Sequence, residues 1–234
     1  MERTIGLAGI GRMGTVLAQR LASCNRLVLY DCDKEKAAVT ARAFGAAVAA
    51  SLQETAACGT IILAVPDRVV AECIRELNRM AQEICVINIA TNVTQSMMEE
   101  VAASHIKCIS VKLIGHAGEM ALGFDPVIIV NEEPPELAER ALTIFASVGQ
   151  VMTGPDDAVA AINNIAAVKA LEAAVAIEDE LCRRGYASDA IIKSALRQVA
   201  AGIIKAYASD DLGPFAAEIV AKLKQEAGKR KSWR

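Results

Sequence analysis

The chain has 234 residues and a net charge of −3. Apolar residues make up 53% of the chain, and aromatic residues make up only 3%. This length fits one large domain or two modest ones. A core built from Ala, Val, Ile and Leu suits parallel strands that are covered by helices. The nearly balanced charge argues against nucleic acid or an anionic membrane as a partner.

No membrane span is expected, because charges, Asn or Gly interrupt each apolar run before about 18 residues accumulate. The N-terminal residues enter a predicted strand at once, without the cleavage region of a signal peptide. The seven cysteines contain no Cys-x-x-Cys pair, which favours free thiols over disulfides or a metal cluster. We therefore expect a soluble, cytoplasmic protein that binds no metal.

From its start to about residue 153 the chain alternates short apolar runs with helical patterns, which is typical of parallel βαβ units. The predicted strands are residues 4–8, 27–30, 46–49, 60–65, 84–89, 107–113, 126–130 and 150–153. The predicted helices between them are residues 13–22, 34–44, 51–57, 68–80, 94–103 and 135–147. Gly45 is suited to a left-handed helix end, Thr94 is suited to an N-cap, and residues 114–118 are predicted to form a glycine-rich loop.

The pattern changes near residue 154, after which no strand is indicated. The predicted helices of this part are residues 158–184, 189–207 and 214–225. The sequence thus predicts an α/β protein with two domains. A doubly wound Rossmann sheet covers residues 1–153, and an all-helical domain covers residues 154–234.

Apolar and small residues form one stripe on each of the first two helices of the predicted helical domain. The stripe residues are Ile162, Ile165, Ala166, Ala173 and Ala176 on the first helix, and Ile191, Ile192, Ala195, Val199, Gly202 and Ile203 on the second. A helical domain with so little side-chain bulk is expected to complete its core against a second subunit. We therefore expect a homodimer that forms through the C-terminal helices.

A Gly-x-Gly-x-x-Gly motif joins the first predicted strand to the first predicted helix. It consists of Gly9, Ile10, Gly11, Arg12, Met13 and Gly14. The first glycine allows a tight turn, the second lets the backbone approach a pyrophosphate, and the third permits close packing of helix on strand. The free amides and the dipole of the following helix favour an anion at this place. The motif and its context predict a dinucleotide-binding site.

Asp31 follows the second predicted strand, about 20 residues beyond the motif, where an acid binds the adenosine ribose hydroxyls. A carboxylate there repels a 2′-phosphate, so the sequence favours NAD over NADP. Asp33 is an alternative for this role, and Lys34 or Lys36 would weaken the rejection of NADP. The nicotinamide half is expected beside the ends of the fourth and fifth strands. The residues at those ends are Val65, Pro66, Asn88 and Ala90.

These segments resemble the superfamily that contains pyrroline-5-carboxylate reductase and the β-hydroxyacid dehydrogenases of the 6-phosphogluconate dehydrogenase type. The resemblance is carried by residues 6–14, by the fifth-strand segment 86–94, and by segments 157–162 and 187–207 of the helical domain. It implies a small-molecule substrate and NAD or NADP as cofactor. It also implies a C-terminal domain that serves dimerisation and substrate binding.

Two motifs of these families are replaced in this chain. Pyrroline-5-carboxylate reductases carry Pro-Asn-Thr-Pro after the sixth strand and Ser-Gly-Ser-Gly-Pro-Ala-Tyr in the helical domain, where residues 112–119 and 163–169 stand here. The β-hydroxyacid dehydrogenases place a Lys three or four residues before an Asn pair. Asn163 and Asn164 match that pair, but Val159 and Ala160 occupy the lysine positions.

Candidates for the chemistry lie beyond the sixth strand and on the first long helix. His116 suits a general acid because its pKa lies near neutrality. Lys169 lies on an apolar helix face, which favours either a reactive amine or an ion pair with Glu172. Lys112 is a candidate ligand for a substrate carboxylate. Asn163 and Asn164 are candidates to orient the substrate or the nicotinamide, with Asn164 grouped among the catalytic candidates.

The sequence therefore predicts an NAD(P)-dependent oxidoreductase that reduces a C=N or C=O bond in a small, carboxylate-bearing substrate. Two alternatives stay open. One is a β-hydroxyacid-type dehydrogenase with a relocated lysine. The other is a non-catalytic protein that senses the cofactor and has lost the active centre.

Overall fold

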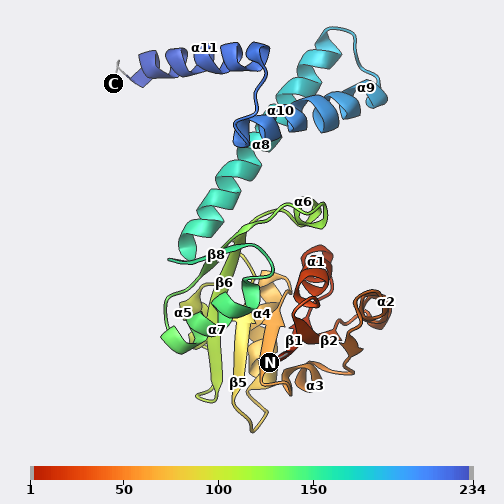
Figure 1. Ribbon diagram of the computed structural model, residues 1–234, viewed down its shortest axis with the longest axis vertical. Coiled ribbons are helices and arrows are strands. Elements are labelled where there is room, and N and C mark those ends of the chain that lie inside the picture. The colour runs from red at the N-terminus through yellow and green to blue at the C-terminus, as the bar shows by residue number, and fades with distance from the viewer. Residues whose placement is uncertain (1–2, 232–234) are drawn as a thin grey trace. The chain divides into compact units, whose positions relative to one another are not determined.

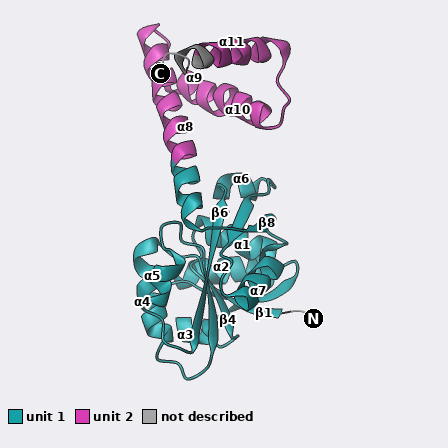
Figure 2. Cartoon of the chain, turned by 90° about the vertical axis from the view of Figure 1, so that its left-hand side faces the viewer, with its two compact units in different colours: residues 1–164 teal, residues 165–234 magenta. Residues whose placement is uncertain are grey.

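The computed structural model describes residues 3–231 and divides into two compact units, Met1–Asn164 and Ile165–Arg234 (Figure 2). The first unit holds all the strands of the described chain and the predicted dinucleotide-binding motif. In its described residues, the second unit consists of helices and the turns that connect them. The predicted fold class, a Rossmann sheet followed by helices, is confirmed.

An eight-stranded sheet forms the centre of the first unit, in the order β3-β2-β1-β4-β5-β6-β7-β8 (Figure 1). Its strands are β1 (Arg3–Ala8), β2 (Asn25–Tyr30), β3 (Ala47–Val48), β4 (Thr60–Leu63), β5 (Ile84–Asn88), β6 (Ile106–Ile114), β7 (Val127–Val130) and β8 (Gln150–Thr153). All neighbouring pairs are parallel except β6 and β7, which are antiparallel. The strand order reverses between β1 and β4, so the carboxyl ends of these two strands form the switch point at which such folds bind ligands.

Helices cover both faces of the sheet, which is why the central strands are mostly apolar. The helices of the first unit are α1 (Arg12–Leu21), α2 (Lys34–Phe44), α3 (Leu52–Ala56), α4 (Asp67–Leu77), α5 (Gln95–Glu99), α6 (Ala117–Ala121) and α7 (Pro135–Phe145). One buried cluster joins the sheet to α1, α2, α6 and α7, and a second joins its other face to α3, α4 and α5.

Local capping explains where several helices begin and end. The Asp33 carboxylate accepts the backbone N–H groups of Glu35 and Lys36 at the start of α2, and Gly45 ends that helix with a φ of 67°. The Thr94 hydroxyl accepts the Met97 N–H at the start of α5. The predicted roles of Gly45 and Thr94 are thereby confirmed.

The structure differs from the predicted elements in three places. Helix α6, residues 117–121, begins within the predicted loop 114–118 and buries Met120 against the core at 3% exposure. Helix α5 ends at Glu99, four residues earlier than predicted. The second helix of the helical region contains a π-helical stretch, Ala195–Ala200, between α9 (Asp189–Ser194) and α10 (Ala201–Ala208).

The helical region begins with α8 (Asp157–Arg183), whose first residues belong to the first unit, and ends with α11 (Pro214–Lys231). Large apolar side chains are exposed along these helices. They include Ile165, Val168, Leu171, Val175, Val199, Ile203, Ile204, Tyr207, Phe215 and Leu223. Exposed apolar area of this kind is typical of interaction surfaces.

Helix α8 is the one helix of the described residues that is long and apolar enough to span a membrane by length and composition. Its most apolar window has a mean hydropathy of 1.4, although Asn, Lys and Glu residues lie along the helix. None of this window is buried in the structure. The same composition suits a helix that packs against another protein surface.

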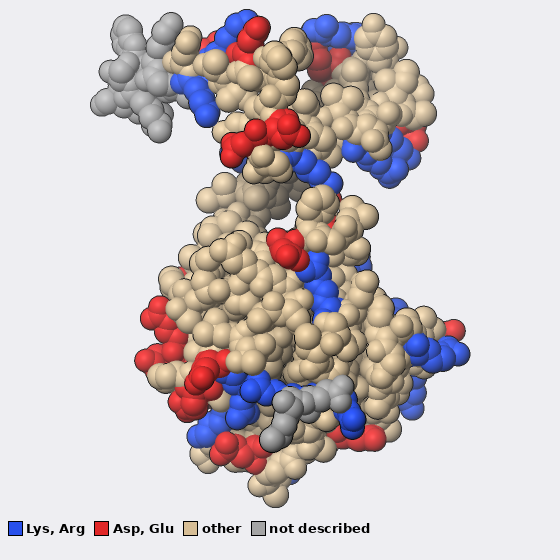
Figure 3. Space-filling model, viewed as in Figure 1, with Lys and Arg blue, Asp and Glu red and all other residues tan. Residues whose placement is uncertain are grey.

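Charged side chains lie in small groups on the visible surface, with uncharged areas between them (Figure 3). On the face shown in Figure 3, basic and acidic side chains alternate without a large area of one sign. This pattern agrees with the net charge of −3.

Candidate functional site

The turn between β1 and α1 contains two glycines at positions where no side chain would fit. Gly9 has a φ of 93°, and a Cβ there would lie 2.5 Å from the carbonyl oxygen of Ala64, beyond the end of β4. A Cβ at Gly14 would collide with the carbonyl oxygen of Gly9. Both glycines are therefore required by the chain's own packing.

Gly11 is different, because a Cβ at this position would meet no atom of the chain within 4 Å. Its φ of −77° and ψ of −167° are accessible to any residue. Packing and backbone geometry thus give no reason for glycine here, whereas close approach of a pyrophosphate does. Gly11 is also the N-cap of α1 without a side-chain hydrogen bond, so the first amides of the helix are open to an anion.

Asp31 ties the end of β2 to this turn. Its Oδ2 accepts the Ile10 N–H at 2.6 Å, and its Oδ1 accepts the Asp33 N–H at 2.8 Å. A carboxylate has about four acceptor positions, so two remain for the hydroxyls of a ribose. Asp31 therefore combines a structural role, which the sequence did not predict, with the predicted capacity to bind the ribose.

A cavity of about 750 Å³ lies beside the glycine loop. It is lined by Ile10, Gly11, Arg12, Thr15, Val16, Asp33, Glu35, Lys36, Val39, Thr40, Ala117, Gly118 and Ala121. The lining brings Arg12 and Lys36 to the pyrophosphate side of the loop, and Lys36 Nζ lies 3.3 Å from Asp33 Oδ2. Residues of α6, which the sequence did not predict as a helix, provide one of its walls.

Arg20 holds the segment that includes α6 against α1. Its guanidinium donates to the backbone oxygens of Met120, Phe124 and Val148 at 2.6–2.8 Å, and to Asp125 Oδ1 at 2.5 Å. The sequence places Arg20 at the end of a helix but gives no signal for partners about 100 residues away. Arg20 is thus a residue that shapes the site and that sequence reasoning missed.

A smaller cavity of about 230 Å³ lies at the carboxyl ends of β4, β5 and β6. It is lined by Met13, Ala64, Val65, Asp67, Ile89, Ala90, Thr91, Leu113, Gly115 and Asn163. The structure thus brings together four of the predicted site residues, namely Met13, Val65, Ala90 and Asn163. The position corresponds to the nicotinamide side of the switch point.

Two polar residues define the chemistry of this small cavity. Asn163 donates from Nδ2 to the Leu113 carbonyl at 2.9 Å, which fixes its amide at the cavity wall. Asp67, in the first turn of α4, is the ionisable residue among the lining side chains, and its Oδ2 accepts from Asn92 Nδ2 at 2.7 Å. Sequence reasoning missed Asp67, although its position directly after Pro66 and β4 was an available signal.

Asn88 and Lys112 lie beneath this cavity and do not line it. Both are buried, at 0% and 1% exposure. Lys112 Nζ donates to the carbonyl oxygens of Ala90 and Val93, the latter at 2.6 Å. Burial lowers the pKa of Lys112 to about 8, and the carboxylates of Asp156 and Asp67 partly oppose this shift. The structure thus gives Lys112 backbone partners where the sequence suggested a substrate carboxylate.

The remaining predicted residues are more exposed. His116 is the N-cap of α6, and it lies between Gly115 and Ala117, which line the small and the large cavity respectively. Pro66 precedes α4, and Asn164 is exposed on α8. Lys169 belongs to the second unit, where its Nζ lies 2.6 Å from Glu172 Oε2 in an exposed ion pair. In the part of the chain that the structure describes, no group of His, Cys, Asp or Glu side chains is arranged to hold a metal ion.

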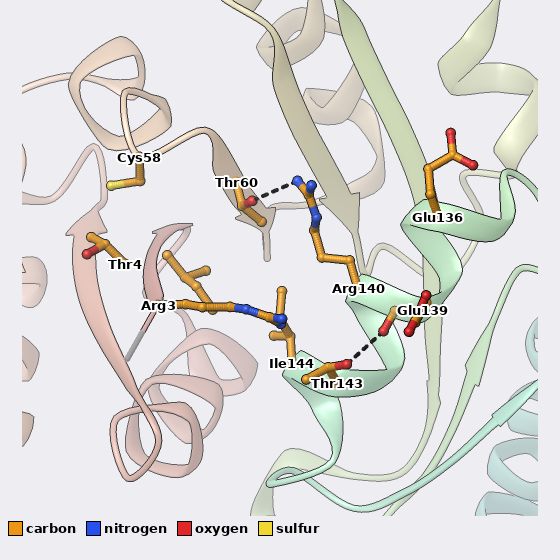
Figure 4. Close-up of a pocket in the computed structure, with 10 residues that line it drawn as sticks. Arg3, Thr4, Cys58, Thr60, Glu136, Glu139, Arg140, Thr143 and Ile144 are labelled. Carbon is orange, nitrogen blue, oxygen red and sulfur yellow. Dashed lines mark hydrogen bonds between the residues drawn. The ribbon is translucent and has the colours of Figure 1, made fainter. Parts of the chain in front are cut away.

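Another cavity, of about 550 Å³, lies at the opposite edge of the sheet (Figure 4). Arg3, Thr60 and Arg140 line it, and Arg140 Nη1 donates to Thr60 Oγ1 at 3.4 Å, as the dashed line shows. This edge holds the amino ends of β1 and β4. Ligands of doubly wound folds bind at the carboxyl ends, so we assign the candidate site to the glycine-loop edge.

Comparison with known proteins supports the dinucleotide-binding unit. Residues 4–92 match the family described as NADP oxidoreductase coenzyme F420-dependent. This range contains the glycine loop, Asp31 and the ends of β4 and β5. Among curated proteins, no sequence matches the chain.

Solved structures share the fold over nearly the whole chain. A pyrroline-5-carboxylate reductase from Coxiella burnetii has a TM-score of 0.70 at 14% identity, covering 98% of this chain and 92% of that chain. A Plasmodium falciparum pyrroline carboxylate reductase with NADP bound has a TM-score of 0.65 at 18% identity, with the same coverages of 98% and 92%.

A 3-hydroxyisobutyrate dehydrogenase from Mycobacterium tuberculosis has a TM-score of 0.63 at 18% identity, covering 95% and 94%. At these identities the likeness establishes the fold. The fold that the predicted resemblance implies is confirmed.

Replacing Gly11 by Ala tests the difference between the three glycines. We expect Gly11→Ala to lower the free energy of unfolding by no more than about 1 kcal/mol, because the added methyl group meets open space and only the N-cap preference for Gly over Ala is lost. The dissociation constant for NADH should rise at least tenfold, because the methyl group occupies the position of the pyrophosphate. Urea unfolding and fluorescence titration measure the two quantities.

Gly14→Ala serves as the contrast, because its methyl group collides with the Gly9 carbonyl and should lower stability by about 1–3 kcal/mol. A Gly11→Ala variant that binds NADH as tightly as the parent chain would show that no pyrophosphate approaches this glycine.

Proposed function

We propose that the chain is an NAD(P)-dependent oxidoreductase that reduces a C=N or C=O bond in a small, carboxylate-bearing substrate. The observation that carries this proposal is the open glycine position at Gly11, on the same sheet edge as the cavity that contains Asp67 and Asn163. The family match over residues 4–92 supports the same cofactor class. The shared fold of the reductases and dehydrogenase supports the same reaction class.

The residues present fit a dinucleotide. The amides at the start of α1 and the Arg12 side chain would hold the pyrophosphate, and the free acceptor positions of Asp31 would hold the adenosine ribose. Val65 and Ala90 would flank the nicotinamide. When bound, the cofactor supplies a hydride, which is chemistry that no side chain can provide.

The chain's own residues then position the substrate and supply a proton. The Asn163 amide orients the substrate or the nicotinamide carboxamide from the cavity wall. His116 is placed next to Gly115 of the small cavity and is our first candidate for the proton donor. Lys169 is the second candidate, and it would have to leave Glu172 in order to act.

Two other functions each have an observation in their favour. The Asn163–Asn164 pair and the fold shared with 3-hydroxyisobutyrate dehydrogenase favour a β-hydroxyacid-type dehydrogenase. A cofactor-sensing protein is favoured by the small cavity, whose lining has a single ionisable residue, Asp67.

A panel of substrates separates these functions. Cyclic imines, short 2-oxo acids and short hydroxy acids are tested with NADH, NADPH and their oxidised forms, and absorbance at the nicotinamide band measures turnover. We expect reduction of at least one carboxylate-bearing imine or oxo acid, and a lower kcat in His116→Ala. Oxidation of a hydroxy acid alone would favour the dehydrogenase, and tight cofactor binding without any turnover would favour the sensor.

We infer further that the chain prefers NAD to NADP, because the Asp31 carboxylate would lie close to a 2′-phosphate. Asp31→Ser should weaken NADH binding about tenfold, since it removes both the ribose ligand and the bond to the Ile10 N–H. NADPH binding should weaken less. The dissociation constant for NADPH divided by that for NADH should therefore fall, which means a smaller preference for NADH.

Asp33→Ser is the matched control, because serine retains the N-cap of α2. If the ratio of the dissociation constants for NADPH and NADH is unchanged in Asp31→Ser but changed in Asp33→Ser, Asp33 and not Asp31 binds the ribose.

We also propose that the chain forms a homodimer through its C-terminal helices. Within the second unit, α10 and α11 enclose an apolar groove of about 550 Å³. Val159 is the only residue of α8 that is fully buried among the described residues. Covering such faces with a second copy would stabilise both subunits by removing apolar surface from water.

Sedimentation equilibrium tests this proposal. Ile203→Glu should shift the chain toward the monomer, because it places a charge on the apolar face. Gln198→Glu adds the same charge at an exposed polar position and should leave the dimer intact. A parent chain that sediments as a monomer at micromolar concentration would contradict the proposal.

A further inference from the structure

Lys112 occupies an unusual place for a charged side chain. It lies on β6 with 1% exposure, on the face of the strand that also carries Cys108 and Ser110. A buried ammonium is costly unless its hydrogen bonds are made. In the described part of the chain Lys112 forms no ion pair, and its bonds go to the backbone oxygens of Ala90 and Val93.

The segment from Ala90 to Val93 links β5 to α5 and is held by Asn88 as well. Asn88 Oδ1 accepts the Ala90 N–H at 3.0 Å, and Asn88 Nδ2 donates to the Val93 carbonyl at 3.2 Å. Asn88 lies on β5 and Lys112 on the neighbouring strand β6, where Asn88 is paired in register with Ser110. The side chains of Asn88 and Lys112 thus hold both ends of one short loop. We call residues 90–93 the β5–α5 loop.

The β5–α5 loop forms part of the wall of the small cavity at the carboxyl edge. Ala90 and Thr91 line this cavity, whereas Asn88 and Lys112 do not. At the outer side of the loop, Asn92 donates to Asp67, which also lines the cavity. Any loosening of the loop would therefore move a wall of the cavity without removing an atom that a ligand touches.

We propose that Lys112 is a positioning residue which, together with Asn88, holds the β5–α5 loop in the shape that receives the nicotinamide half of the cofactor. This role rests on the proposed dinucleotide-binding function. Lys112 itself touches neither cofactor nor substrate. It acts through the two carbonyl oxygens that it binds.

The two halves of the cofactor provide the test, because different elements bind them. Gly11, Arg12 and Asp31 would hold the ADP-ribose half, whereas the β5–α5 loop would contact only the nicotinamide half. Loss of the Lys112 hydrogen bonds should thus weaken NADH binding and leave ADP-ribose binding intact. A general loss of structure would weaken both.

The experiment measures dissociation constants of NADH and ADP-ribose for the full chain and three variants. Lys112→Met keeps an unbranched side chain that is one atom shorter and donates no hydrogen bond, and Lys112→Arg keeps the donors. Lys107→Met removes an exposed lysine from the same strand and is the matched control. NADH binding is followed by nicotinamide fluorescence, and ADP-ribose binding by calorimetry.

We expect Lys112→Met to raise the dissociation constant for NADH at least tenfold while that for ADP-ribose changes less than twofold. Lys112→Arg should restore most of the NADH affinity, and Lys107→Met should match the parent chain. Equal losses for both ligands, or no loss for NADH, would overturn the positioning role. A parent chain that binds neither ligand would instead contradict the proposed function. The positioning role, which depends on that function, would then be wrong as well.

A variant on the other strand covers the case in which Lys112→Met does not fold. Asn88→Ala removes the two hydrogen bonds that Asn88 makes to the β5–α5 loop and should show the same separation between NADH and ADP-ribose. An Asn88→Ala chain whose NADH affinity stays within twofold of the parent would contradict the proposal.

The dependence of stability on pH provides a check on the burial of Lys112 in solution. Burial lowers the pKa of Lys112 to about 8, against the opposing carboxylates of Asp156, which precedes α8, and Asp67 on α4. Between this pH and about 10.5 the unfolded chain binds more protons, so the unfolding free energy of the parent should rise relative to Lys112→Met as pH increases. The absence of this rise would show that the pKa of Lys112 is not lowered in solution and would contradict the burial of its side chain.

Discussion

The backbone of the turn after β1 touches the backbone beyond β4, and the candidate cofactor site depends on this contact. Gly9 lies against the Ala64 carbonyl, and Gly14 lies against the Gly9 carbonyl, with no room for a Cβ at either position. The contact directs the N-terminus of α1 to the edge where β1 and β4 diverge. The Asp31 carboxylate then fixes the turn by accepting the Ile10 N–H. A site for an anion follows from packing alone, before any ligand is considered.

The two sides of this edge are built in different ways. On the adenosine side, the shape comes from absent side chains and from one carboxylate that is partly open to solvent. On the nicotinamide side, it comes from a loop held from below by Asn88 and Lys112, two buried polar side chains. Such side chains stabilise one arrangement of the loop only if all their hydrogen bonds are made. This difference is why substitutions on the two sides should affect separate parts of the cofactor.

The sequence predicted those features of the fold and site that depend on local patterns. The glycine loop, Asp31, the strands up to β8 and the caps at Gly45 and Thr94 are of this kind. It did not predict the burial of Lys112, because alternation along β6 looks like a strand with one polar face. In the centre of a sheet with helices on both sides, that face is covered too. Arg20 and α6 were missed for a related reason, since their contacts join segments about 100 residues apart and leave no periodic signal.

Helix α8 and the helices after it expose an apolar surface. Either lipid or another protein surface could cover such a face. The periodicity of apolar residues along a helix predicts which face is buried, but it does not tell whether lipid or protein buries it. The charged pair of Lys169 and Glu172 lies near the middle of α8, where each charge would cost about 2.5–3.5 kcal/mol in a bilayer on insertion scales. At a protein interface the same pair can stay at the rim, in water, while the apolar face beside it is buried. The many alanines of α8 also allow a second helix to approach closely, and the physical balance therefore favours a protein partner for this face.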